Sequence, residues 1–223
     1  MITIGYWGIL GAGEYSKWVA SHLGVAFEEK TEEREEWFAT RKASLGLDLP
    51  NLPYLLDGDF KISESKAIPY YIAHKANKPE IVGGDLIGQT KVRMFIDFID
   101  DLVNKIKGAI FAGEKEKIAE RLGGIVTDAG FKTKFEYLSK SLGDKEFLTG
   151  AEVTLADFHF AWNATLLGVV LRSAGVEDIF TTHDNLKALV EKVKALPGVA
   201  ARIAATAGRP ALPPTFFPFE LKP

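Results

Sequence analysis

Apolar and polar residues alternate in short runs along residues 1–80, and the runs switch between strand and helix patterns. The run ITIGYW at 2–7 is β-branched and aromatic, which favours a strand. Residues 14–24 place apolar side chains at helical spacing. Further strands are predicted over 25–30, 54–57 and 60–62, and further helices over 31–46 and 65–77. This order, βαβαββα, predicts an α/β domain of thioredoxin type over residues 1–79.

The stretch 51–68 combines a hairpin with a helix start. Pro53 stands at a strand entrance, and an Asp-Gly pair supplies turn residues between two apolar runs. A proline is tolerated at such a place when a sharp or cis turn leads into the strand, so one backbone edge is expected to stay free. The sequence SES at 63–65 offers oxygens that cap a helix start. Because a helix N-terminus also attracts carboxylates, these features predict a small-molecule site with a free backbone edge and an anion seat.

From residue 89 onward the apolar period is helical almost throughout. Helices are predicted over 94–111, 131–143, 153–171 and 186–205, the last broken at Pro197. The helix over 153–171 is apolar on most faces, which is typical of a buried central helix, and it opens with a T-x-x-D capping box. Residues 80–88 predict a linker, so an all-α domain is expected over 89–223. Its Pro- and Phe-rich tail, 209–223, cannot be helical and is expected to pack back over the protein or to line a pocket.

Composition narrows the possible functions. With 27 basic and 30 acidic residues, the chain lacks the basic excess that nucleic-acid binding needs. There is no cysteine, which excludes thiolate metal sites and a cysteine nucleophile, and the four histidines lack ligand spacing, so no metal is expected. No apolar run approaches the length of a membrane span, and the N-terminus has no basic flank of a signal peptide. A cytoplasmic protein without membrane partners is expected.

The N-terminal loop partly imitates a dinucleotide-binding motif. Gly11, Gly13 and Ser16 nearly match G-x-G-x-x-G, and Glu28 and Glu29 stand where a ribose-binding acid would. The third glycine is missing, however, and a doubly wound sheet would need further strands beyond residue 78. We therefore set aside a nucleotide-dependent oxidoreductase.

Five segments together resemble the cytosolic glutathione S-transferases, and most closely the mu class. They are IGYWGILG (4–11), Arg34-x-x-Trp37, LGLDLPNLPYLLDG (45–58), KISESKAI (61–68) and TGAEVTLADF (149–158). The resemblance extends from about residue 3 to the Arg-Pro pair in the tail. It implies a thioredoxin-like glutathione-binding domain, a helical bundle and a homodimer. Glutathione would be a co-substrate, and no further cofactor is implied.

In this family a tyrosine at the end of the first strand donates a hydrogen bond to the glutathione sulfur, and Tyr6 holds that position. The resemblance implies that Leu52 pairs with the peptide as an added strand, that Pro53 is cis, and that Ser65 holds the γ-glutamyl carboxylate. Glu64 replaces the glutamine usual in the mu class and would accept from the γ-glutamyl ammonium. The implied glutathione contacts are Trp7, Arg34, Trp37, Arg41, Lys42, Asn51, Leu52, Pro53, Glu64, Ser65 and, from the partner subunit, Asp101.

Two of these assignments stay open in the sequence. The spacing from Trp37 to the following Leu-Gly pair is one residue longer than in the family, so Arg41 and Lys42 compete for the clamp on the glycyl carboxylate. Asp100 likewise competes with Asp101.

The resemblance also implies an apolar electrophile pocket, formed with Trp7 by Ile9, Leu10, Phe111, Phe216 and Phe217. Phe111 stands where the mu class has a tyrosine, which removes a possible hydroxyl donor. Leu49 replaces the phenylalanine that serves as a key in the mu dimer interface, which suggests a weaker or differently packed dimer. The leading hypothesis is glutathione transfer to hydrophobic electrophiles, with Tyr6 stabilising the thiolate. The alternative is a non-catalytic protein of the same fold that binds glutathione or a hydrophobic ligand.

Overall fold

A computed structural model describes residues 1–221, and the chain divides into two compact units. The first comprises Met1–Pro79 and Ala195–Leu212, and the second comprises Glu80–Lys194 and the chain from Pro213 onward. The sequence pattern had placed everything after residue 89 in one helical domain. The structure differs because Ala195–Leu212 belong to the first unit, although they follow most of the second unit in the chain.

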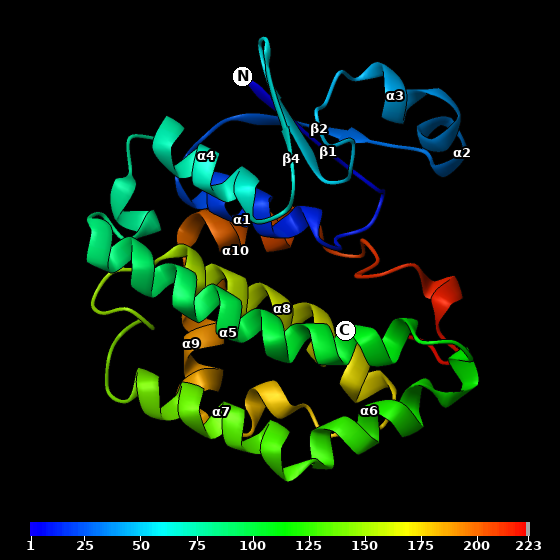
Figure 1. Ribbon diagram of the computed structural model, residues 1–223, viewed down its shortest axis with the longest axis vertical. Helices are drawn as coiled ribbons and strands as arrows, with labels where there is room; N and C mark the ends of the chain where they lie inside the picture. Colours follow the sequence, from blue (N-terminus) through cyan, green and yellow to red (C-terminus); the bar gives the residue numbers. More distant parts are fainter. Residues whose placement is uncertain (222–223) are drawn as a thin grey trace. The chain divides into compact units, whose positions relative to one another are not determined.

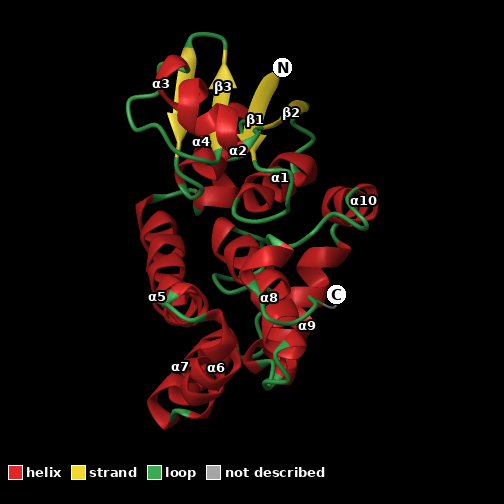
Figure 2. Ribbon diagram, turned by 90° about the vertical axis from the view of Figure 1, so that its right-hand side faces the viewer, coloured by secondary structure: helices red, strands yellow, loops and turns green. Residues whose placement is uncertain are grey.

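The first unit is built on a four-stranded mixed sheet, with its strands drawn in yellow in Figure 2. Its strands are β1 (Ile2–Tyr6), β2 (Phe27–Thr31), β3 (Tyr54–Asp57) and β4 (Phe60–Ser63), in the order β2-β1-β3-β4. Central β1 pairs in parallel with β2 and antiparallel with β3, which pairs antiparallel with β4. The predicted thioredoxin-like arrangement is confirmed.

The helices of the first unit lie where the apolar period predicted helices, with shifted ends (Figure 1). They are α1 (Gly13–His22), α2 (Arg34–Glu36), a π-helical turn (Trp37–Arg41), α3 (Lys42–Ser44), α4 (Ala67–Lys75) and α10 (Pro197–Ala205). The helix expected over 31–46 is thus three short pieces. The helix expected over 65–77 begins at Ala67, since the preceding residues form a tight turn in which the Glu64 carbonyl accepts from the Ala67 and Ile68 N–H groups.

Helix α10 belongs to the first unit because it packs closely on α1. A Cβ placed on Gly198 would lie 2.1 Å from the Ser21 carbonyl oxygen, so only glycine permits this approach. The predicted break at Pro197 is confirmed: α9 (Asp184–Ala195) ends before it and α10 begins with it. Proline suits that first helical position because its missing N–H would have no partner there.

The second unit consists of helices around a buried central one. They are α5 (Leu86–Phe111), α6 (Ile118–Thr127), α7 (Ala129–Leu142), α8 (Leu155–Ser173) and α9. Helix α8 is buried over almost its whole length, as its all-round apolar pattern predicted. Helix α5 starts inside the predicted linker because the Asp85 side chain accepts from the Gly88 N–H and caps it. Over residues 1–221, no helix is long and apolar enough to cross a membrane.

Helix α6 was not predicted as a separate element. Adjacent glycines, Gly123 and Gly124, lower its intrinsic helix propensity. Its buried residues Ile118, Leu122 and Val126 nevertheless recur every fourth position, and that spacing was the available signal.

The capping box at the start of α8 is confirmed. The Asp157 carboxylate accepts from the Thr154 N–H at 2.8 Å and from the Leu148 N–H at 2.7 Å, and Asp157 is fully buried. Val153 and Phe158, which flank the capping box, are both buried.

Replacing Asp157 by alanine is expected to cost about 2–3 kcal/mol, because it removes the cap and leaves two buried N–H groups without their acceptor. The midpoint of urea unfolding measures this loss. The exposed Asp144→Ala variant is the matched control and should unfold like the wild type. An equal midpoint for both variants would contradict the assigned role of the cap.

Candidate functional site

Tyr6 lies at the end of β1, with its hydroxyl held by the loop that follows. The Ala12 N–H donates to the Tyr6 Oη at 3.0 Å. Burial raises the pKa of Tyr6, and the bond from Ala12 offsets only part of that rise. The phenol therefore keeps its proton at neutral pH and can act as a hydrogen-bond donor rather than as a base.

Gly11 and Gly13, the two glycines of the apparent nucleotide motif, leave room for the Tyr6 side chain. A Cβ on Gly11 would lie 2.5 Å from the Tyr6 Cε1, and one on Gly13 would lie 2.6 Å from the Tyr6 Cγ. Gly11 also has a φ of +43°, a conformation that L side chains rarely adopt. The G-x-G sequence thus lets the loop and α1 approach an aromatic ring, which is a physical reason for these glycines that needs no nucleotide.

Replacing Gly13 by alanine is expected to lower kcat/KM for glutathione conjugation by at least about tenfold, with about 1–3 kcal/mol of lost stability from overpacking. The new methyl group would displace the Tyr6 ring or the start of α1. The matched control is Gly123→Ala in α6, where no described atom lies within 4 Å of the added Cβ. Full activity of the Gly13 variant would show that the Tyr6 position tolerates such a shift.

The aromatic side chains of Trp7, Trp37, Phe38 and Tyr54 form a connected group. Trp7 meets the Trp37 ring edge-on at 6.2 Å and lies 6.4 Å from the Phe38 ring. Trp37 is buried and stacks on the Tyr54 ring, with an angle of 8° between the planes. Trp7 and Trp37, two of the predicted glutathione contacts, therefore lie together. Tyr54 and Phe38, which were not predicted, pack beside them.

The π-helical turn contains the extra residue that the spacing after Trp37 indicated. Such turns accommodate a one-residue insertion within a helix. At its end, Arg41 donates from Nη2 to the Glu32 Oε1 at 3.1 Å and to the Tyr54 Oη at 3.3 Å. Tyr54 in turn donates to the same Glu32 oxygen at 2.5 Å. The buried Glu32 carboxylate is thus compensated by Arg41 and Tyr54, a pairing that the sequence did not predict.

Burial and the Glu32 carboxylate together hold the pKa of Tyr54 well above its usual value. The hydrogen bonds from Arg41 to Glu32 likewise raise the pKa of Arg41. Both groups keep their protons at every physiological pH, so the Glu32 carboxylate always has two donors.

Lys42 is placed differently from its neighbour. Its Nζ lies 5.9 Å from the centre of the Phe38 ring, and the Arg34 guanidinium lies 5.3 Å from the same ring. Lys42 and Arg34 are both exposed. A hollow of about 460 Å³ is lined by Lys42, Leu49, Pro50, Asn51 and Glu64. Of the two competing cations, Lys42 faces this hollow, whereas the Arg41 guanidinium is engaged by Glu32.

The strand entrance has the predicted cis peptide bond between Leu52 and Pro53. The Leu52 N–H, which we expected to be free, donates to the Asn51 Oδ1 at 2.9 Å. The Asn51 amide also donates to the Glu64 Oε1 at 3.2 Å. The Asn51 side chain therefore occupies the backbone donor that an added peptide strand would use.

Glu64 and Ser65 form the turn before α4. Glu64 has a φ of +78°, a conformation that costs a non-glycine residue about 1–3 kcal/mol and is common at ligand sites. Ser65 does not cap α4, contrary to expectation: Lys66 is the N-cap residue and no side chain caps the helix. The Ser63 hydroxyl instead donates to the Leu49 carbonyl.

Asp100 and Asp101, the two candidate aspartates of α5, have different surroundings. Asp100 accepts from the His159 ring at 2.9 Å and is mostly buried. The Asp101 carboxylate is exposed, with Lys134 at 3.4 Å. Of the two, Asp101 is the one on the surface of the helical unit.

The residues predicted to form an apolar pocket fall in both units. Ile9 and Leu10 are half-buried in the loop of the first unit. In the second unit the exposed Phe111 and Phe216 rings meet edge-on at 6.1 Å, with Phe216 ending a short 3₁₀ turn (Pro214–Phe216), whereas Phe217 is buried. The tail was predicted to be non-helical, and that short turn is the exception.

Part of the tail packs back over the loop that follows Tyr6. The Leu10 N–H donates to the Pro210 carbonyl and the Gly11 N–H to the Ala211 carbonyl, both at 2.9 Å. The tail was expected either to pack back over the protein or to line a pocket, and residues 210–211 pack back over the protein.

A thioredoxin-like sheet with a cis-proline strand entrance, followed by an all-helical unit, is the architecture of the glutathione-transferase fold. The family model for the glutathione S-transferase N-terminal domain matches residues 2–74, and that for the C-terminal domain matches residues 100–205. A glutathione S-transferase of Tyrophagus putrescentiae is 30% identical over 214 residues, covering 91% of this chain and 89% of that protein. Glutathione S-transferase Mu 4 of Mus musculus is 29% identical, covering 90% and 89%.

The solved structures agree with the sequence comparisons. The crystal structure of the glutathione S-transferase Blo t 8 superposes with a TM-score of 0.82 at 26% identity, covering 96% of this chain and 98% of that chain. The chain belongs to the glutathione S-transferase family and is an enzyme close to its mu class.

Proposed function

We propose that this enzyme stabilises the thiolate of glutathione through the Tyr6 hydroxyl and transfers it to apolar electrophiles. The observation that carries the proposal is the Ala12 N–H bond to the Tyr6 Oη at 3.0 Å. Because the oxygen already accepts from Ala12, its own hydrogen points elsewhere and is available to a sulfur. A phenol that stays protonated suits this donor role.

The energetic demand on Tyr6 is moderate. A free thiol has a pKa of about 8.5 and is only a few per cent thiolate at neutral pH. Lowering that pKa by about two units takes about 3 kcal/mol, and one charge-assisted hydrogen bond supplies about 1.5–3 kcal/mol. Backbone donors and nearby cations would add the remainder.

The peptide part of glutathione would replace the Asn51 side chain. Its cysteinyl carbonyl would accept from the Leu52 N–H, and its γ-glutamyl ammonium would take the place of the Asn51 amide at Glu64. The γ-glutamyl carboxylate would sit at the uncapped turn of Ser65. Lys42, rather than Arg41, would clamp the glycyl carboxylate, since the Arg41 guanidinium is engaged by Glu32.

The electrophile would be apolar and could carry aromatic rings. The exposed Phe111 and Phe216 rings of the helical unit offer such a surface without a hydroxyl donor. Reactions that need a second acid, such as epoxide opening, would lack one from Phe111. A role in conjugating hydrophobic xenobiotics in the cytoplasm follows from this chemistry.

A homodimer completes the proposed site. Asp101 is exposed on α5 and would reach the γ-glutamyl end in the partner subunit. Leu49, 69% exposed, would be the apolar key of the interface. Being smaller than an aromatic key, it would bury less area and hold the dimer less tightly.

Calorimetric titration with glutathione, together with conjugation to a chloronitrobenzene substrate, tests the proposal. We expect both binding and conjugation. Binding without conjugation of any of several aromatic electrophiles would favour the alternative, a non-catalytic ligand-binding protein of this fold. Failure to bind glutathione would overturn the proposed function.

A further inference from the structure

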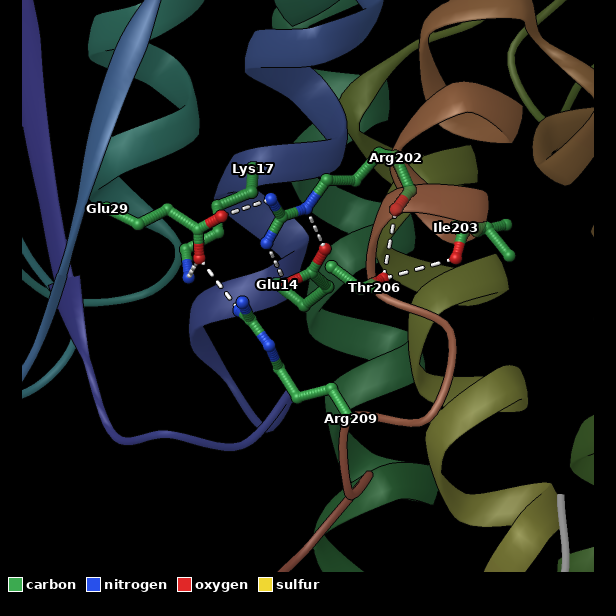
Figure 3. Close-up of polar contacts among 7 residues, drawn as sticks. All are labelled: Glu14, Lys17, Glu29, Arg202, Ile203, Thr206 and Arg209. Carbon is green, nitrogen blue, oxygen red and sulfur yellow. Dashed lines mark hydrogen bonds and ion pairs between the residues drawn. The ribbon is translucent and has the colours of Figure 1, made fainter.

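A buried cluster of charges joins α10 to α1 and β2 within the first unit. The Arg202 guanidinium donates to both oxygens of Glu14, from Nε at 2.5 Å and from Nη2 at 2.9 Å (Figure 3). The side chains of Glu14 and Arg202 are 1% and 9% exposed, respectively. A two-point guanidinium–carboxylate pair fixes orientation as well as distance.

Glu29 of β2 completes the cluster from the other side. Its carboxylate accepts from the Arg202 Nη1, and from Lys17 and Arg209 at 2.8 Å each. Burial alone would raise the pKa of Glu29, but these three cations hold it well below its usual value. Burial alone would lower the pKa of Arg202, but its bonds to Glu14 and Glu29 keep it above its usual value. Glu29 and Arg202 are therefore charged at neutral pH.

The pair lies next to the segment that holds Tyr6. Glu14 is in the first turn of α1, directly after the loop whose Ala12 N–H binds the Tyr6 Oη. Within the loop itself, the Pro210 and Ala211 carbonyls accept from the Leu10 and Gly11 N–H groups. The segment from Arg202 to Ala211 thus contacts the loop at Leu10 and Gly11 and the first turn of α1 at Glu14.

We propose that Arg202 is a positioning residue for Tyr6: by holding Glu14 it fixes the first turn of α1 and so the Ala12 N–H that orients the Tyr6 hydroxyl. The inference rests on the proposed function, because it concerns the same hydroxyl. Glu14 is the residue through which Arg202 acts. Helix α10 thereby contributes to the orientation of a hydroxyl that lies about 200 residues earlier in the chain.

A purely structural role is the competing explanation for this cluster. Buried ion pairs are costly to desolvate and often contribute little net stability, whereas removing one partner is strongly destabilising. Loss of stability in an Arg202 variant would therefore not distinguish the two roles. The state of the Tyr6 hydroxyl does distinguish them.

The experiment uses the full chain with Arg202→Met, Arg202→Lys, Glu14→Gln and the double variant Glu14→Gln/Arg202→Met. The first readout is the titration of the Tyr6 ring carbon in ligand-free protein by NMR, assigned with Tyr6→Phe. The second is the pH profile of kcat/KM for conjugation. Arg172→Met is the matched control, because Arg172 also pairs at 2.5 Å with a buried carboxylate, that of Asp178 in the helical unit.

Arg202→Met should raise the apparent pKa of Tyr6, and with it that of the bound thiol, by about 0.5–1 unit, because the Ala12 bond is loosened. At neutral pH kcat/KM should fall about threefold to tenfold, with the glutathione Kd changed less than about twofold. Glu14→Gln should give a similar shift, and the double variant should add nothing further if Arg202 acts through Glu14. Lysine can donate to only one carboxylate oxygen at a time, so Arg202→Lys should recover part of the loss.

An unchanged Tyr6 titration and pH profile in Arg202→Met, with only a lower Tm, would overturn the inference. Equal shifts in the Arg172→Met control would do the same. If Arg202→Met does not fold, Arg202→Lys decides by the same readouts. If the wild type forms no thiolate with bound glutathione, the proposed function fails, whereas the Tyr6 titration still decides whether Arg202 positions the hydroxyl.

Discussion

Replacing Tyr6 by phenylalanine is expected to lower kcat/KM for conjugation at neutral pH by about 10- to 100-fold, because it removes a hydrogen bond of about 1.5–3 kcal/mol to the thiolate. The apparent pKa of the bound thiol should rise by about one to two units, which moves the rate profile to higher pH. Since a thiolate forms above its pKa, the variant should approach wild-type rates on the alkaline side. Steady-state kinetics across pH measures both changes.

Tyr137→Phe provides the matched control, as it removes a hydroxyl from an exposed tyrosine of α7. Its rate profile should coincide with that of the wild type. Glutathione affinity should change little in Tyr6→Phe, because the peptide part keeps its own contacts. A Tyr6→Phe enzyme with an unshifted profile would assign thiolate stabilisation to other groups.

Replacing Arg41 by methionine is expected to destabilise the protein by about 3–5 kcal/mol. Among the residues that the structure describes, the buried Glu32 carboxylate would keep only the Tyr54 hydroxyl as a side-chain donor, and removing one partner of a buried ion pair has a cost of this size. Urea unfolding measures it. A companion variant, Arg41→Met/Glu32→Gln, removes the uncompensated charge and should recover much of the loss.

Lys42→Met is the matched variant one residue further on. Lys42 is exposed and lines the hollow with Asn51 and Glu64, so its loss should leave stability within about 0.5 kcal/mol. It should instead raise the glutathione KM by about fivefold to tenfold, as expected for a lost charge-assisted bond to the glycyl carboxylate. The reverse result, with stability lost at Lys42 and glutathione affinity lost at Arg41, would exchange the two roles.

The different surroundings of these neighbours show the limit of sequence reasoning at the site. Both are long cations after Trp37, and the extra residue in the spacing left either one possible as the clamp. The structure directs Arg41 to Glu32 and leaves Lys42 at the surface, and the proposed assignment of the clamp to Lys42 rests on this difference. No local propensity indicates this, because Glu32 and Tyr54 come from other elements of the unit.

Two further features of the site also could not be predicted from neighbouring residues: the hydrogen bond between Asn51 and the Leu52 N–H, and the uncapped start of α4. Local rules for proline allowed a sharp or a cis turn before Pro53, the family resemblance implied the cis bond that the structure contains, and the helix start predicted an anion site near Ser65. The sequence did not predict that the Asn51 amide would occupy the Leu52 N–H, since that depends on what competes for the donor.

By itself, the sequence determined the order of strands and helices over residues 1–79, the break at Pro197 and the capping box of α8. Periodicity, turn residues and caps act between neighbours in the chain, so they can be recognised without the fold. The tertiary structure alone decided that α10 belongs to the first unit, that Gly11 and Gly13 serve Tyr6, and that Arg202 pairs with Glu14. These contacts depend on close packing and on buried charges finding partners, and Glu14 and Arg202 are 188 residues apart in the chain.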